Sequence, residues 1–197
     1  MHKEAIYYLS EKLIAICAER EVEYIADLIS NGTLLDVETA KRLADDCKVM
    51  RANLTIDGMG ETHNKRRILV SGGDSYDTIM KNIEDCAEVL NTVVRINVDK
   101  DNADEIENFT KYLIDEKKWL LNPSFYLAFV DDYAESCLID KSTCVPIEQI
   151  AEMSHRYERA VYASNRNTVT GTFFPRRKAT YCGGECTLSY VAVYRNT

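Results

Sequence analysis

Polar residues stand within or directly after three apolar segments whose lengths suit β-strands. Ser30 and Asn31 close the first segment, Thr55 and Asp57 close the second, and Arg95 lies among valine and isoleucine residues in the third. In parallel α/β sheets, ligands bind at the carboxyl ends of the strands. These five residues are therefore the first candidates for a ligand-binding site.

Arg95 in particular needs a partner, because an unpaired charge inside an apolar strand is costly. The carboxylate of a bound ligand would supply that partner, and so would a neighbouring aspartate in a structural network. Asn31 with Gly32 is also typical of a tight turn, and Asp57 could cap the turn or helix that follows it. The residue types alone leave these alternatives open.

Two further polar features in the region after Asp57 are weaker signals. His63 is more typical of a residue that fixes a loop than of a base or a ligand. Gly72 and Gly73 lie in no G-x-G-x-x-G or P-loop pattern, so we do not expect a nucleotide-phosphate site there.

Cys182 and Cys186 enclose two glycines and a glutamate, and such a turn can wrap around an iron or zinc centre. Two thiolates make only half of a metal site, and a glycine-rich hairpin with incidental thiols is the alternative. The other cysteines are scattered. We expect Cys17, Cys47 and Cys86 to be small core residues, while Cys137 and Cys144 are weak ligand candidates.

The elements that must position these residues alternate along the chain. The expected strands are 22–30, 52–57, 93–99 and 124–130, and the expected helices are 4–20, 37–47, 76–90, 103–117 and 146–164. Asp36 is the expected N-cap of the second helix, and Ser75 or Asp74 that of the third. Strands joined through helices form a parallel sheet, so the fold class is α/β, and both a doubly wound sheet and a barrel fit.

Composition limits the possible functions. The chain of 197 residues is 46% hydrophobic and 28% charged, as in globular proteins, and its net charge of -8 argues against non-specific nucleic-acid binding. No apolar stretch approaches the roughly 20 residues of a membrane span, and the start lacks the apolar core of a signal peptide. Seven cysteines without an export signal favour reduced thiols. We therefore expect a cytoplasmic protein without membrane or nucleic-acid partners.

Four segments in order resemble radical S-adenosylmethionine (AdoMet) enzymes, in particular the anaerobic sulfatase-maturase and peptide-modifying subgroup that carries a SPASM extension. The segments are YIADLISNGTLLD, LTIDGMGETHNKRR, GGDSYDTIMKNIEDC and VVRINVDKDNADEI. They are similar to the later strands of the radical AdoMet (β/α)6 barrel, and the resemblance runs from about Tyr24 to Thr197. It implies a partial parallel (β/α) barrel in 1–145, a linking helix in 146–165 and the beginning of a SPASM-like, cysteine-containing extension in 166–197.

The resemblance also implies the chemistry. A 4Fe-4S cluster donates an electron to AdoMet, and the resulting 5'-deoxyadenosyl radical takes a hydrogen atom from a peptide or protein substrate, with a ferredoxin or flavodoxin as electron donor. Carried over by position, Ser30 and Asn31 lie near AdoMet, Thr55 and Asp57 near its ribose or methionine portion, and Arg95 near its carboxylate. Cys182 and Cys186 begin the ligand set of an auxiliary iron-sulfur cluster.

Two motifs of these enzymes are absent from the sequence: the Cys-x3-Cys-x2-Cys loop that binds the radical-generating cluster, and the Gly-Gly-Glu motif. We therefore expect an internal fragment that begins just before the third barrel strand and is inactive alone. A barrel without its first strands exposes a sheet edge, which predicts possible self-association. Two other classes remain: a non-catalytic α/β domain that binds a small anionic ligand, and a doubly wound domain with structural zinc.

Overall fold

The computed structural model of the protein describes residues 1–130, 143–164 and 193–194. Its helices are α1 (Lys3–Glu19), α2 (Val37–Asp45), α3 (Glu61–Arg66), α4 (Tyr76–Cys86), α5 (Ala103–Asp115) and α6 (Ile147–Ser164). Its strands are β1 (Glu23–Tyr24), β2 (Ala26–Ser30), β3 (Val49–Ile56), β4 (Asn91–Val98), β5 (Ser124–Phe129) and β6 (Val193–Tyr194). None of the helices in these ranges is long and apolar enough to cross a membrane.

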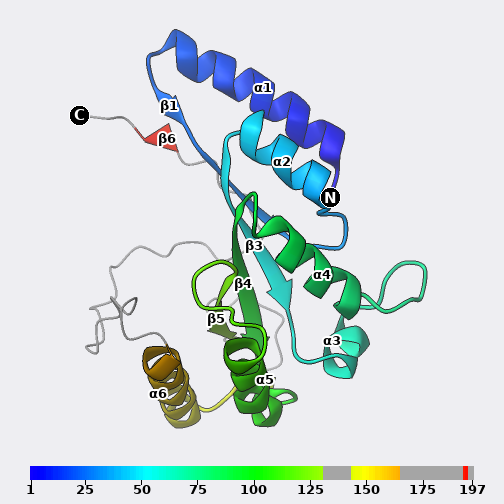
Figure 1. The fold of residues 1–197 in the computed structure, drawn as a ribbon, viewed down its shortest axis with the longest axis vertical. Helices are drawn as coiled ribbons and strands as arrows, with labels where there is room; N and C mark the ends of the chain where they lie inside the picture. The colour runs from blue at the N-terminus through cyan, green and yellow to red at the C-terminus, as the bar shows by residue number, and fades with distance from the viewer. Residues whose placement is uncertain (131–142, 165–192, 195–197) are drawn as a thin grey trace.

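Four strands form one parallel sheet in the order β2-β3-β4-β5, and helices connect each strand to the next (Figure 1). Successive strands are neighbours, so the carboxyl ends of all four point to the same end of the sheet. This arrangement confirms the predicted α/β class and corresponds to a partial (β/α) barrel. The short strands β1 and β6 pair with each other, antiparallel, outside this sheet.

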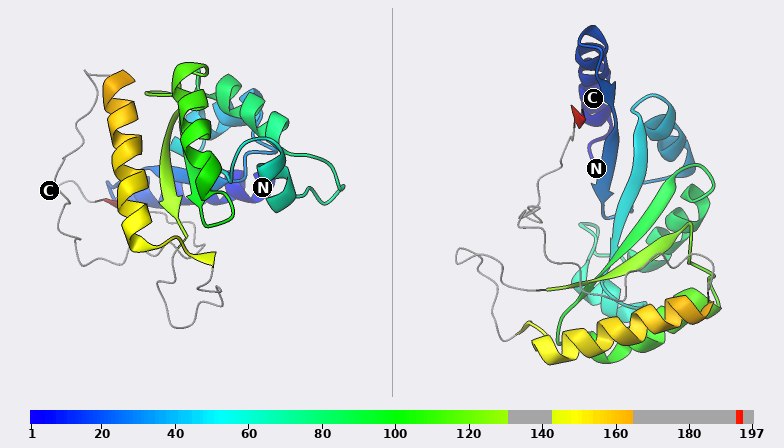
Figure 2. Two further views of the ribbon diagram at one scale, coloured as in Figure 1. Left: turned by 90° about the horizontal axis from the view of Figure 1, so that it is seen from below. Right: turned by 90° about the vertical axis from the view of Figure 1, so that its left-hand side faces the viewer.

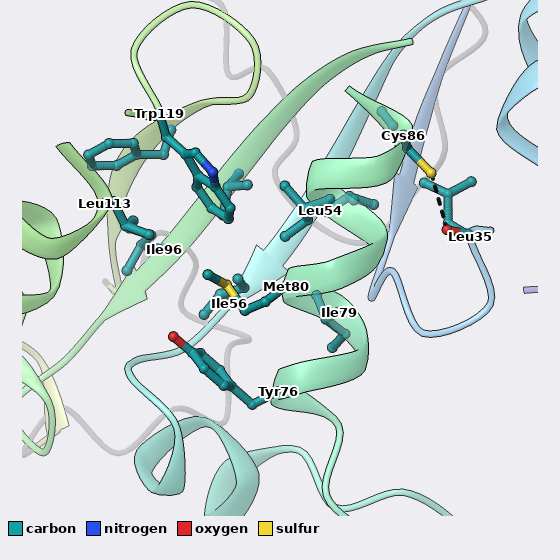
Figure 3. Close-up of a cluster of buried hydrophobic side chains, with 14 of the residues drawn as sticks. Leu35, Leu54, Ile56, Tyr76, Ile79, Met80, Cys86, Ile96, Leu113 and Trp119 are labelled. Carbon is teal, nitrogen blue, oxygen red and sulfur yellow. Dashed lines mark hydrogen bonds between the residues drawn. The ribbon is translucent and has the colours of Figure 1, made fainter. Parts of the chain in front are cut away.

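Helices α2, α4 and α5 cover one face of the parallel sheet, and the hydrophobic core lies between them and the strands (Figures 1 and 2). Alternate residues point into this core, which explains why every second position is buried from Ala52 onward in β3 and from Thr92 onward in β4. Figure 3 shows the central side chains, which include Leu54, Ile56, Ile79, Ile96, Leu113 and Trp119.

Helix α6 packs beside α5 at the β5 side of the sheet (Figure 2). The hydroxyl of Tyr157 donates a hydrogen bond to the backbone oxygen of Phe125 over 2.6 Å, and the two aromatic rings lie 5.4 Å apart. The helix predicted after Pro146 is therefore joined to the sheet by a partly buried polar contact as well as by apolar packing. The division of the chain into 1–145, 146–165 and 166–197 stays a prediction.

The core interpretation of three cysteines is confirmed, since Cys17, Cys47 and Cys86 are free and buried. The thiol of Cys86 donates to the backbone oxygen of Leu35 over 3.3 Å, as the dashed line in Figure 3 marks. Burial raises the pKa of this thiol to about 11, with smaller contributions from nearby aspartates. Cys86 is therefore an inert core residue.

Several predicted boundaries were wrong. The expected buried strand 22–30 is divided into β1 and β2. Ile29 is 61% exposed because it lies beside Asn53 in register, on the face of the sheet away from α2, α4 and α5. Helix α3 lies where a loop was expected. The sequence did not predict this helix, because its six mostly polar residues show no apolar periodicity. Helix α4 ends at Cys86 instead of residue 90. The predicted cap of α2 is confirmed, because Asp36 accepts from the backbone nitrogen of Thr39 over 2.7 Å.

Candidate functional site

The face of the parallel sheet opposite α2, α4 and α5 is polar. Its half-buried side chains come from alternate positions of three adjacent strands. The polar ones are Asn53 and Thr55 of β3, Arg95 and Asn97 of β4, and Ser124 and Tyr126 of β5, while Val93 of β4 and the exposed Ile29 of β2 are apolar members of the same face. In register, Thr55 lies opposite Arg95, and Arg95 lies opposite Tyr126. We call this surface, extended by Asp57 at the end of β3, the open face.

Asp57 is the anchor at the carboxyl end of the open face, and the residue is only 6% exposed. Its Oδ1 accepts a hydrogen bond from Asn97 Nδ2 over 2.8 Å, and its Oδ2 accepts from Arg67 Nε over 2.5 Å. The Arg67 side chain is 36% exposed, so one side of this ion pair reaches solvent. The expected cap is not formed, because Gly60 is the N-cap residue of α3 and Asp57 pairs with Arg67 instead.

Arg95 lies next to this anchor without a carboxylate partner of its own. Its Nε donates to Asn97 Oδ1 over 2.9 Å, and within the described ranges no carboxylate lies at salt-bridge distance from its guanidinium. The terminal nitrogens of Arg95 likewise have no hydrogen-bond acceptor in that part of the chain. The charge and geometry of such a guanidinium suit a carboxylate.

Ser30 and Asn31 lie in a tight turn after β2. Ser30 Oγ accepts from the backbone nitrogen of Gly32 over 3.2 Å, and Asn31 Oδ1 accepts from the backbone nitrogen and hydroxyl of Thr33 over 3.3 and 3.0 Å. Gly32 has a φ of 78°, and a Cβ there would lie 3.2 Å from Ile79 Cγ2, so both the backbone conformation and the close contact favour glycine. The turn alternative therefore holds, although turn residues at strand ends can also contact ligands.

The structure thus brings three of the five predicted residues, Thr55, Asp57 and Arg95, together on the open face. Ser30 alternates with the buried Leu28 and shares the helix-covered side of the sheet, so its side chain points away from the other three. Asn31 lies at the same end of the sheet, in the turn.

His63 fixes the segment that carries Asp57 and Arg67. Its Nδ1 accepts from the backbone nitrogen of Asp57 over 3.1 Å, so the ring proton is assigned to Nε2, which donates to Ser75 Oγ over 3.1 Å. Ser75 Oγ in turn donates to the backbone oxygen of Arg67 over 3.0 Å. Burial lowers the pKa of His63; Asp57 opposes this shift and Arg67 adds to it. The loop-fixing interpretation of His63 is confirmed.

Sequence reasoning missed Arg67 and a second ion pair, between Arg66 and Asp99. Arg66 donates through both terminal nitrogens to the two Asp99 oxygens, over 2.8 and 2.5 Å. Burial works against ionisation of Asp99, but the Arg66 hydrogen bonds and two backbone donors hold its pKa below the ordinary value. The sequence feature that could have indicated these ion pairs is the adjacent Arg66 and Arg67 after His63. Only the folded structure shows that the two arginines pair with different carboxylates.

The described residues contain no group of three histidine, cysteine, aspartate or glutamate side chains that could hold a metal ion. Cys144 is free and half-buried. Cys137, Cys182 and Cys186 lie outside the described residues, so the predicted iron-sulfur ligands stay a prediction.

Solved structures share this fold. The structure "Native anSMEcpe with bound AdoMet" matches with a TM-score of 0.56 and 20% sequence identity, over 77% of this chain and 39% of that chain. "Native anSMEcpe with bound AdoMet and Kp18Cys peptide" matches with a TM-score of 0.57 and 20% identity, over 79% and 41%. AnSMEcpe is an anaerobic sulfatase-maturating enzyme of the radical AdoMet type.

The chain has the fold of part of anSMEcpe. It spans about two fifths of the length of the anSMEcpe chains, as their coverages of 39% and 41% show. No protein-family model matches the sequence, and neither does a curated protein sequence. The likeness therefore concerns the arrangement of the backbone.

Proposed function

We propose that the carboxyl end of the open face, where Thr55, Asp57 and Arg95 lie, binds AdoMet and that this chain forms part of a radical AdoMet enzyme that modifies a peptide or protein. The observation that carries the proposal is Arg95, a half-buried guanidinium without a carboxylate partner in the described part of the chain. AdoMet ends in a carboxylate, which would satisfy Arg95. AnSMEcpe, which has the same fold, is solved with AdoMet bound.

The other predicted residues would hold different parts of the same ligand. Thr55 lies opposite Arg95 on the neighbouring strand and offers a hydroxyl to the methionine portion. Asp57, already held by Asn97 and Arg67, has acceptor capacity for the ribose hydroxyls or the amino group. The turn with Ser30 and Asn31 would border the ligand at the same end of the sheet.

AdoMet bound next to a reduced iron-sulfur cluster supplies hydrogen-atom abstraction. The residues of this chain would bind and orient the cofactor, and Cys182 and Cys186 would contribute to an auxiliary 4Fe-4S cluster. A peptide substrate is supported by the anSMEcpe structures with bound peptide, and a ferredoxin or flavodoxin would supply the electron. We expect this chain to need further barrel strands and cluster ligands for activity.

Equilibrium dialysis with AdoMet tests the proposal. The wild-type chain is expected to bind AdoMet, and Arg95→Gln is expected to weaken binding at least tenfold, because a charge-assisted hydrogen bond pair is lost. Arg51→Gln is the matched control, since Arg51 lies on β3 in an exposed pair with Asp27. Equal AdoMet affinities for the wild type and Arg95→Gln would refute the assignment.

A non-catalytic domain that binds another small anion is the second candidate, because Arg95 would serve any carboxylate. Iron binding distinguishes the radical AdoMet enzyme from the non-catalytic binding domain. After anaerobic reconstitution with iron and sulfide, the enzyme proposal predicts bound iron that is lost in Cys182→Ser with Cys186→Ser. Metal-free protein would favour the binding domain, and stoichiometric zinc would favour a structural zinc site at the same cysteines.

A further inference from the structure

A hydrogen bond joins β3 to β5 across the open face. Asn53 Nδ2 donates to the hydroxyl oxygen of Tyr126 over 3.1 Å. Asn53 lies opposite Val93 in register, and Tyr126 lies opposite Arg95. The contact therefore passes over β4 between these two residues and lies on the amino-terminal side of the predicted AdoMet residues.

This pair is incompletely hydrogen bonded. Asn53 Oδ1 is buried and has no hydrogen-bond partner among the described residues. Tyr126 uses its oxygen as an acceptor, so its own proton is left for another acceptor. If the Asn53 amide is turned over, Tyr126 donates to Oδ1 and the amide nitrogen loses its partner. Both orientations leave at least one donor and one acceptor unused.

An unsatisfied buried polar atom destabilises a fold and calls for a physical explanation. Replacement of the pair by leucine and phenylalanine would fill the same volume without this cost. The location favours a ligand as the explanation, because Arg95, whose terminal nitrogens have no acceptor among the described residues, lies on the strand between Asn53 and Tyr126.

We propose that Asn53 and Tyr126 form a binding site for a planar amide group, supplied by the backbone of a peptide substrate. A peptide unit presents one donor and one acceptor, which matches the two unused groups. A carboxylate offers only acceptors and an ammonium only donors, so neither would satisfy both. This site deepens the proposed function and rests on it, since it places the peptide beside the ligand of Arg95.

The first test is an NMR titration that follows the side-chain amide of Asn53 and the ring signals of Tyr126. The probe is N-acetylglycine N-methylamide, with sodium acetate and adenosine as comparison ligands. We expect saturable shifts with the amide probe, weakened at least tenfold in Asn53→Leu and in Tyr126→Phe. Ser124→Ala is the control, because Ser124 lies on the same face of β5, two residues before Tyr126.

Three outcomes would overturn the site: no saturable shift with the amide probe, equal shifts with acetate, or tighter binding of adenosine. The last result would assign the pair to the base of AdoMet, whose edge also carries a donor and an acceptor. AdoMet dialysis on the same variants separates this failure from failure of the proposed function. Asn53→Leu is expected to retain AdoMet affinity within threefold, whereas Arg95→Gln is not.

A second measurement needs no ligand. The double variant Asn53→Leu with Tyr126→Phe is expected to unfold at a higher temperature than the wild type, because both incompletely paired groups are replaced together. A purely structural hydrogen bond predicts the opposite, a lower unfolding temperature. A lower temperature in the double variant would contradict the proposal.

Discussion

Asn97 donates a hydrogen bond from Nδ2 to Oδ1 of Asp57 over 2.8 Å and so ties the carboxyl end of β4 to that of β3. The same side chain accepts from Nε of Arg95 over 2.9 Å. Because its amide has both a donor and an acceptor, Asn97 can connect a carboxylate to a guanidinium, while the terminal nitrogens of Arg95 have no acceptor in the part of the chain that the structure describes. The orientation of Arg95 on the open face depends on this link.

Asn97→Asp is expected to lower the affinity for AdoMet at least tenfold. The new carboxylate would pair with Arg95 and compete with the carboxylate of the ligand, and it would also repel Asp57. Equilibrium dialysis measures the effect, and Asn91→Asp at the exposed start of β4 is the control. Unchanged affinity in a folded Asn97→Asp protein would show that Asn97 does not position Arg95.

Asp57→Asn is expected to reduce the free energy of unfolding by about 1–3 kcal/mol, because two donors lose a charged acceptor at a buried position. Urea titration followed by circular dichroism gives the value. Asp27→Asn breaks the exposed pair with Arg51 and should cost about 0–1 kcal/mol. Similar losses in the two variants would mean that the Asp57 network adds no more than a surface ion pair.

His63 predicts a pH dependence of stability. Burial lowers its pKa below the ordinary 6.5, so the ring stays neutral in the folded state while the unfolded chain takes up a proton. This contribution to stability is complete above pH 6.5 and is lost as the pH falls from 6.5 toward the folded pKa. The slope approaches about 1.4 kcal/mol per pH unit for a full proton difference.

Urea unfolding between pH 7 and pH 5 tests this dependence. His63→Gln is expected to unfold with a shallower pH slope than the wild type. His155→Gln, on the exposed side of α6, should keep the wild-type slope. Parallel curves for the wild type and His63→Gln would contradict the buried neutral histidine.

The edge strand β2 predicts self-association. It pairs only with β3 in the four-stranded sheet, and the 61%-exposed Ile29 adds an apolar side chain to this edge. Analytical ultracentrifugation should show a mass that rises with concentration, and Ile29→Lys should shift the protein toward monomer. Ile147→Lys on α6, where Ile147 is 75% exposed, serves as the control. A wild-type protein that stays monomeric at all concentrations would contradict self-association through β2.

Much of the fold could be predicted from the sequence, because alternating apolar periods define βα units and their crossovers require a parallel sheet. The ends of the strands could be placed closely enough to select Thr55, Asp57 and Arg95. The face of the sheet to which each of these side chains points was harder to predict. One residue of register decides the face, and Ser30 proved to lie on the helix side.

The remaining features depend on contacts that no local pattern encodes. Arg67 reaches Asp57 only because α3 and the following turn fold back, and α3 itself is too short and polar to show a period. The pair of Asn53 and Tyr126 joins residues from two strands that both flank β4, far apart in the chain. Such pairs follow from tertiary structure and could not be predicted from residue spacing.

The central claim is that Arg95 recognises the carboxylate of AdoMet, and a comparison with decarboxylated AdoMet tests it most directly. Calorimetric titration of both ligands into the wild type and Arg95→Gln gives a four-way comparison. The wild type should prefer AdoMet at least tenfold, and Arg95→Gln should bind the two ligands equally. If the wild type binds both ligands equally well, or if Arg95→Gln keeps the full preference, then Arg95 does not read the carboxylate and the account is wrong.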